Sequence, residues 1–181
     1  MLLRDARDAY LHDAGLGDGG YDLPWVKLRM GRVPLAIPNT ASRKRAVPLH
    51  DLHHCLTGYG TDWAGEFEIS AWEIASNCRG YGFAWYINLQ GMLAGLFYSP
   101  RRTWRAWVRG RSNRNLYAIG FSDALLQRSV DELRRELLLD RPAPPATLGN
   151  AASFAAAQVA AVVISFGPLV VPFLALRALL A

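Results

Sequence analysis

The distribution of apolar and polar residues divides the chain into four stretches, which are residues 1–48, 49–139, 140–150 and 151–181. In the second stretch apolar residues recur every three to four positions, which is typical of amphipathic helices. Little of the chain alternates as a half-buried strand does, and a short extended piece is expected only within residues 108–121. We therefore predict an all-α fold, with a single helical domain and a hydrophobic C-terminal helical tail.

The first stretch indicates little regular structure beyond one short helix over residues 2–11. The glycines and prolines that follow it indicate irregular chain laid over the core. Pro48 suits the first turn of a helix, where its missing N–H has no partner, so we expect the next helix to run from about Leu49 to Leu56. The predicted helical domain covers residues 1–140 and includes this irregular segment.

The last stretch is the most apolar part of the chain. Residues 141–150 are predicted to be a proline-rich linker, and residues 151–181 carry a single charged residue, Arg177. A membrane-spanning helix needs about 20 apolar residues, and this tail is longer. A glycine and two prolines interrupt it, so a kinked span, a re-entrant hairpin and a membrane-dipping anchor all stay open. A buried core helix is the alternative, but the linker favours an appended membrane anchor.

Composition and charge narrow the class of protein further. The 181 residues are 51% hydrophobic and 11% aromatic, which suits one folded domain and excludes a disordered chain. A net charge of +5 and a pI of about 9.6 favour anionic partners. Cys55 and Cys78 form no spaced set, so we expect buried thiols in a reducing compartment. The expected location is the cytoplasmic side of a membrane, as a peripheral or tail-anchored protein.

Residues 101–114 combine six arginines with Trp104 and Trp107. Three of the arginines, at positions 101, 105 and 109, share one face of a helix. Such a helix is typical of a protein lying on an anionic membrane surface, and a plain solvated face is the alternative. No recognised nucleic-acid motif accompanies the arginines, so a membrane or an anionic substrate is favoured over nucleic acid.

Three of the four histidines lie in "HDLHH", residues 50–54. A helix places His50 and His54 one turn apart on the same face, so their ring nitrogens can point at one metal ion. Asp51 can reach that ion from the flank, or it can orient a histidine. His53 points about 100° away from the His54 direction and is interpreted as a non-ligand.

Glu66 can complete the site only if the chain doubles back after His54. The two residues are twelve positions apart, about 18 Å along a straight helix. The segment "TGYGTD" (57–62) supplies a reversal, because its glycines tolerate positive φ and Thr61 or Asp62 can cap a second helix. On spacing alone, a metal ligand and a glutamate that complements the helix dipole are equally good interpretations of Glu66.

The pattern His50-Asp51-x-x-His54, followed by eleven residues and Glu66, resembles the signature of the coenzyme Q (ubiquinone) biosynthesis protein 4 family. The resemblance covers roughly residues 43–139. In that family the four matching positions are the assigned ligands of zinc, so the resemblance implies a Zn²⁺ site here. Mn, Fe and Co would also suit two imidazoles with carboxylates. The N-terminal prolines and the apolar tail depart from the family.

The resemblance also implies a function. The family is implicated in C1 decarboxylation of a polyprenylated 4-hydroxybenzoate-type ring, so we expect a metal-dependent lyase of ubiquinone biosynthesis. The alternative is a non-catalytic prenyl-lipid-binding or scaffold protein that organises the biosynthetic complex around a structural metal. Expected partners are a prenylated aromatic acid or another prenyl lipid, and a membrane surface; other ubiquinone-biosynthesis proteins and a homo-oligomer stay open. An HD-type phosphohydrolase is disfavoured, because His12 is the only further histidine.

Decarboxylation needs a proton donor and, for a prenyl tail, an apolar groove. Glu68 and Tyr59 are the candidate donors, and Glu73 is a third. Large apolar residues recur at helical spacing beyond them, with small residues between. On sequence alone this pattern favours an ordinary close-packed helical core over a groove, and the resemblance favours a groove. The candidate groove residues are Trp72, Trp85, Tyr86, Leu93 and Phe97.

Overall fold

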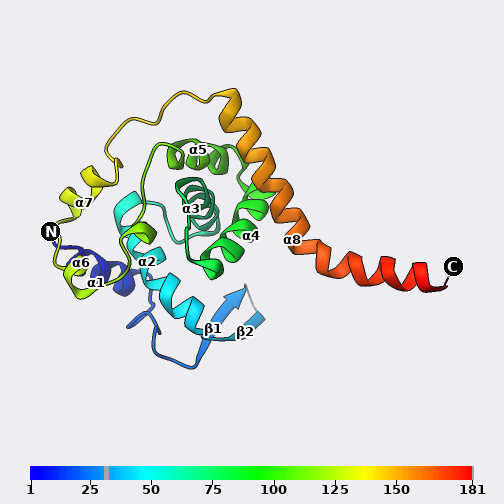
Figure 1. Cartoon of the computed structure of the whole chain (residues 1–181). Coiled ribbons are helices and arrows are strands. Elements are labelled where there is room, and N and C mark those ends of the chain that lie inside the picture. The colour runs from blue at the N-terminus through cyan, green and yellow to red at the C-terminus, as the bar shows by residue number, and fades with distance from the viewer. Residues whose placement is uncertain (31–32, 181) are drawn as a thin grey trace.

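A computed structural model describes residues 1–30 and 33–180 and confirms the all-α prediction (Figure 1). A small hairpin accompanies the helices. The elements in chain order are α1 (Leu3–Asp13), β1 (Trp25–Met30), β2 (Val33–Pro38), α2 (Ala41–Thr57), α3 (Trp63–Ser76), α4 (Gly82–Tyr98), α5 (Pro100–Gly110), the 3-10 helix η1 (Leu116–Ala118), α6 (Asp123–Leu126), α7 (Val130–Glu136) and α8 (Leu148–Leu180).

Helix α3 lies at the centre, with α2, α4 and α5 around it (Figure 1). Its Ile69 and Trp72 have no exposed surface and join fully buried leucines of α2 in one core. Glycines bring the neighbouring helices close to α3. A Cβ on Gly110 of α5 would lie only 2.6 Å from the Trp72 carbonyl oxygen, so no larger residue fits there without a shift.

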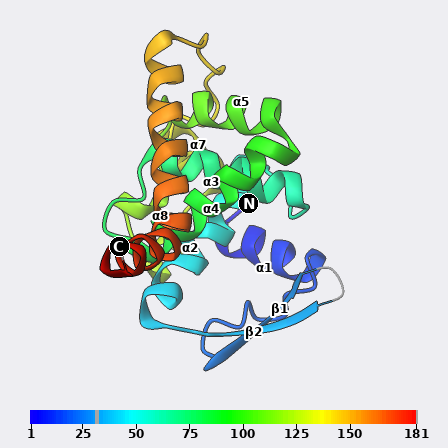
Figure 2. The ribbon, with the colours of Figure 1, turned by 90° about the vertical axis from the view of Figure 1, so that its right-hand side faces the viewer.

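The N-terminal part is more regular than expected. Helix α1 confirms the short helix, but β1 and β2 form an antiparallel pair in which Trp25 pairs with Pro38 and Met30 with Val33 (Figures 1 and 2). The prediction of irregular chain throughout this region was therefore wrong. In a two-stranded sheet each strand has one unpaired edge, where a proline need not cost a ladder hydrogen bond.

Helix α2 begins eight residues earlier than the expected start at Leu49. The Thr40 hydroxyl accepts a hydrogen bond from the Arg43 N–H and caps the helix, so Pro48 lies inside α2 rather than in its first turn. This cap and the burial of Ala46 and Leu49 outweigh the one helical hydrogen bond that Pro48 cannot make. The extended piece expected within residues 108–121 is also absent from that described segment, where α5 and η1 lie.

Helix α8 starts at Leu148, three residues before the expected start of the tail, and runs without a break to Leu180. Its first half lies along α4 and α5, and its second half bends away from the rest of the chain (Figures 1 and 2). An uninterrupted helix excludes the re-entrant hairpin. Pro168 lies where a bend is expected, because proline removes a helical hydrogen bond.

The contacts of α8 explain the tryptophans of α5. Phe154 packs against both Trp104 and Trp107, with ring centroids 5.3 Å apart in each pair. Ala161 has no exposed surface, so part of the tail is core structure. The tryptophans thus hold α8, and the expectation that they face a membrane was wrong.

Two arginines of α5 contact neighbouring helices. Arg102 forms an ion pair with Glu68 at 2.6 Å, and Arg109 donates to the Thr57 carbonyl at 3.2 Å. Arg101 and Arg105 are exposed. The three arginines expected on one surface, at 101, 105 and 109, are therefore reduced to two.

Candidate metal centre

The reversal predicted between His54 and Glu66 is present. Gly58 ends α2 with φ of +78°, a left-handed conformation that glycine adopts without strain, and its N–H donates to the His54 carbonyl at 3.0 Å. Asp62 caps α3 by accepting a hydrogen bond from the Gly65 N–H at 2.9 Å. Glu66 consequently lies in the first turn of α3 and faces back toward α2.

Three side chains converge across this turn. The Nε2 atoms of His50 and His54 lie 3.2 Å apart, and each lies 3.4 Å from one carboxylate oxygen of Glu66. One potential ligand atom from each of the three residues falls within 4.8 Å of the others. Two imidazoles and a carboxylate at these separations form a compact donor set for one cation.

The contacts of Nδ1 in each histidine show which ring nitrogen carries the proton and which has a lone pair available for a metal ion. Nδ1 of His54 lies 3.0 Å from the Tyr59 carbonyl oxygen, which can only accept, so this nitrogen carries the proton. Nδ1 of His50 faces the buried carboxylate of Glu73 at 3.0 Å. In their neutral forms both rings thus direct an Nε2 lone pair toward the other, which is unfavourable unless a proton or a metal ion lies between them. The residues present therefore fit a divalent metal ion.

The electrostatics of the cluster favour positive charge at the same point. Burial alone would lower the pKa of His50, but the charges and hydrogen bonds of Glu73 and Glu66 raise it well above its usual range. Burial also acts to raise the pKa of Glu66, yet its interactions with His50 and His54 lower it to about 2. In the absence of a metal ion, a proton on His50 supplies part of the positive charge that this cluster favours.

Asp51, the fourth expected ligand, lies beside this cluster but is not among the three converging residues. Its carboxylate accepts a hydrogen bond from the Tyr21 hydroxyl at 2.6 Å, from the segment before the hairpin. Burial raises the pKa of Asp51, although the charges of His50 and His54 oppose this shift. The structure thus brings together three of the four expected ligands and gives Asp51 a different partner.

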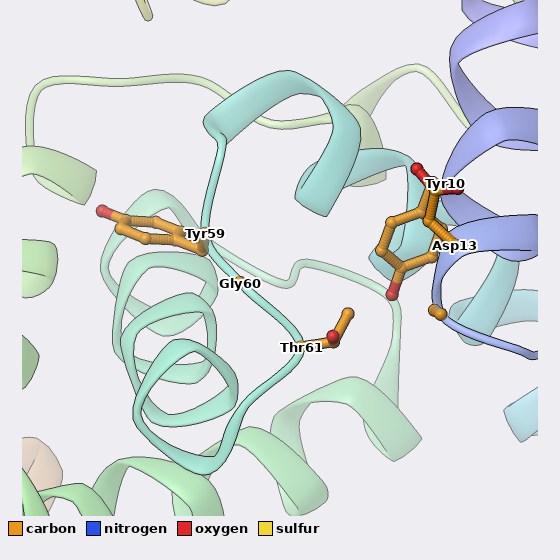
Figure 3. A pocket seen from close by; sticks show the side chains of 6 residues that line it. Tyr10, Asp13, Tyr59, Gly60 and Thr61 are labelled. Atoms are coloured by element: carbon orange, nitrogen blue, oxygen red, sulfur yellow. The ribbon is translucent and has the colours of Figure 1, made fainter.

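A pocket of about 240 Å³ lies between the end of α1 and the turn after α2, and none of the three converging residues lines it (Figure 3). The Tyr10 ring forms one wall and stacks on the His54 ring, with centroids 5.4 Å apart. Sequence reasoning missed Tyr10, because only a short amphipathic helix, with no motif, marks its position. The lining residues are Tyr10, Asp13, Ala14, Tyr59, Gly60 and Thr61.

The three candidate proton donors all have other contacts, and Glu73 faces His50 and His53. Glu68 is held by Arg102, and the Tyr59 ring lies under the Arg109 guanidinium at 5.2 Å. Figure 3 shows the Tyr59 hydroxyl pointing away from the side of the pocket where Tyr10 and Thr61 lie. The backbone of Tyr59, rather than its hydroxyl, contacts the centre through His54.

The five candidate groove residues do not share one surface. Trp72 is fully buried, and its indole N–H donates to Asn113 at 2.8 Å. Trp85, Tyr86 and Phe97 are exposed on α4, with 81% of Phe97 accessible, and Leu93 is half-buried.

The small residues of α4 serve close packing. A Cβ on Gly91 would overlap the Ser70 side chain, and one on Gly95 would lie 2.8 Å from Phe67 Cβ. This geometry confirms the plainer interpretation, a close-packed helical interface, for these glycines.

The fold and the site define an all-α protein with a histidine–carboxylate centre between two helices, α2 and α3, that a short turn connects. Over 96 residues the chain is 29% identical to the ubiquinone biosynthesis protein coq4, mitochondrial, of Aspergillus fumigatus, and equally to that of Aspergillus clavatus. Each match covers 51% of this chain and 33% of the relative, so the chain spans about a third of the length of these relatives. No family model and no solved structure matches the chain.

Proposed function

We propose that the chain is a metal-dependent lyase of ubiquinone biosynthesis that removes the C1 carboxylate from a prenylated 4-hydroxybenzoate-type acid. The observation that carries this proposal is the set of three converging ligand atoms of His50, His54 and Glu66. Catalytic zinc sites keep three protein ligands and one open position, whereas structural sites are closed by four. The similarity to relatives named as ubiquinone biosynthesis proteins supports the pathway.

The residues divide the work as follows. His50, His54 and Glu66 would hold the ion, with Zn²⁺ the best match to two nitrogens and an oxygen, and Mn, Fe or Co as further candidates. When bound, such an ion acts as a Lewis acid on a carboxylate or ring oxygen and stabilises the developing negative charge. Tyr10 stacks on His54 and lines the cavity, so its hydroxyl is placed to donate a hydrogen bond to an acid bound there.

The chemistry requires a proton at the carbon that loses CO₂. Glu68 and Tyr59 remain candidate donors in this proposal, but the ion pair of Glu68 and the direction of the Tyr59 hydroxyl count against both. Tyr10 is the stronger candidate by position, because it lies between the cavity and His54.

The protein is also proposed to work at a membrane. Within the described residues, Leu148–Pro168 of α8 is long and apolar enough to cross a bilayer, with a mean hydropathy of 1.6 and 11% of that segment buried. Because this half of α8 lies against α4 and α5, the half that projects beyond Gly167 is the proposed anchor. Val163 and Phe166 are exposed within Leu148–Pro168, and Trp85, Tyr86 and Phe97 are exposed on α4. Apolar surface of this extent suits a prenyl lipid or a membrane.

The exposed face of α4 also supports the second candidate function, a non-catalytic prenyl-lipid-binding or scaffold protein. Trp85, Tyr86 and Phe97 could hold a prenyl chain or another ubiquinone-biosynthesis protein without any chemistry at the ion. In that case the metal would only join α2 to α3.

Release of CO₂ from a prenylated 4-hydroxybenzoate-type acid separates the two candidates. The lyase proposal predicts release by the purified protein, loss of release after chelation while circular dichroism shows intact helices, and recovery when Zn²⁺ is returned. Tyr10→Phe should lower turnover without lowering the zinc content. Absence of CO₂ release from a fully metal-loaded, folded protein, with retained binding of the prenylated acid, would favour the scaffold.

A further inference from the structure

A fully buried carboxylate lies directly behind the metal centre. Glu73 of α3 has no exposed surface, and four donors surround its two oxygens. Oε1 faces Nδ1 of His50 at 3.0 Å and Nδ1 of His53 at 2.6 Å. Oε2 accepts from the Tyr117 hydroxyl at 2.8 Å and from the Asn88 amide. Donors from α2, α4 and η1 therefore meet on this one side chain.

His53 shows how protons are arranged in this cluster. Its Nε2 accepts a hydrogen bond from the backbone N–H of Leu116 at 2.9 Å. A backbone N–H can only donate, so the ring proton of His53 is on Nδ1 and points at Glu73. All four groups around Glu73 can then donate, and an ionised carboxylate is the state that accepts from all of them.

The same carboxylate determines what His50 offers to the ion. We propose that Glu73 is a positioning residue that holds the His50 proton on Nδ1, so that Nε2 is free to bind the metal. The other neutral tautomer would place an N–H between His54 and Glu66, where it would block the ion. Histidine ligands commonly donate their second N–H to such a carboxylate, which fixes the tautomer and the ring orientation. This inference rests on the proposed metal site.

Glu73→Gln tests the role, with Tyr117→Phe as the matched control. Glutamine keeps the size of the side chain but removes its charge. It also replaces one accepting oxygen with an NH₂ group, which would face the surrounding hydrogen-bond donors. Tyr117→Phe removes a partner from Oε2 and leaves the contact between Oε1 and His50. Both variants disturb the same buried network, so both should lower the melting temperature. Only Glu73→Gln is expected to weaken zinc affinity, by about 10- to 100-fold.

The measurement is the zinc dissociation constant by competition with a chromophoric chelator at one pH, with His50→Ala as the reference. Wild-type affinity in His50→Ala would show that the metal site itself is wrong. Loss of affinity in His50→Ala, with wild-type affinity in Glu73→Gln, would overturn only the role of Glu73. Equal loss in Glu73→Gln and Tyr117→Phe would also overturn it, because the effect would then be merely structural.

A second measurement applies if Glu73→Gln does not fold. In zinc-loaded wild-type protein with ¹⁵N-labelled histidine, the ring nitrogens of His50 should show a proton on Nδ1 and zinc on Nε2. Zinc on Nδ1 of His50 would contradict the inference without any variant.

Discussion

At the scale of single residues, side-chain partners decide which groups can bind an ion. His50 and His54 each have Nδ1 engaged, by Glu73 and by the Tyr59 carbonyl, so both present Nε2 to Glu66. Asp51 instead contacts Tyr21 at 2.6 Å. The sequence spacing predicted that these groups are neighbours, but it carries no information about Tyr21, which lies 30 positions away and takes up the aspartate.

The role of Asp51 can be tested directly. If the protein ligands are His50, His54 and Glu66, Asp51→Asn should keep about one zinc ion per chain. It should also lower stability by about 1–3 kcal/mol, because the buried hydrogen bond to Tyr21 is weakened. Elemental analysis and thermal unfolding measure the two effects. Loss of zinc from a folded Asp51→Asn protein would place Asp51 among the ligands.

At the scale of elements, local signals predicted much of what forms. Gly58 and Asp62 predicted the reversal between α2 and α3, because a left-handed turn and a helix cap have distinct residue preferences. The start of α2 and the hairpin were predicted wrongly, since Pro34, Pro38 and Pro48 were given too much weight as breakers. The position of the prolines alone does not show that Thr40 caps α2, or that the unpaired edges of a two-stranded sheet accommodate proline.

The glycines of α4 provide an element-scale test of close packing against a groove. Gly95→Ala should lower the free energy of unfolding by about 1–3 kcal/mol, because its Cβ would meet Phe67 and Thr103 together. Gly82→Ala on the same helix is the control, since a Cβ there meets nothing within 4 Å. Its stability should be unchanged or raised by up to about 1 kcal/mol. Equal stability in both variants, measured by urea unfolding, would indicate open space beside Gly95.

At the scale of the whole molecule, α8 belongs both to the core and to the surface. Its first half covers Trp104 and Trp107 through Phe154, whereas its second half extends away from the helices (Figure 1). Hydrophobicity predicted an apolar tail but could not separate its packed half from its projecting half, because apolar residues of the same types occur in a core and in apolar surroundings outside it. The division follows only from which helices α8 lies against.

Two truncations separate these roles of α8. A chain ending at Thr147 should melt at a lower temperature, because it exposes Trp104 and Trp107. A chain ending at Gly167 should keep the wild-type melting temperature but leave anionic vesicles in 1 M salt, where the Debye length is about 3 Å. The full-length chain should stay bound under the same conditions. Vesicle binding by the Gly167 truncation that resists salt as well as the full-length chain does would rule out the projecting half as the anchor.

The metal content of purified protein tests the central claim most directly. Wild-type protein reconstituted with Zn²⁺ and freed of excess metal should retain about one ion per chain by elemental analysis. His50→Ala, His54→Ala and Glu66→Ala should each lose it while circular dichroism shows wild-type helix content, because each removes one of three converging ligand atoms. Glu68→Ala, which removes a carboxylate held by Arg102 outside the centre, should keep the ion. A folded wild-type protein that binds no divalent ion, or three variants that retain it fully, would contradict the account.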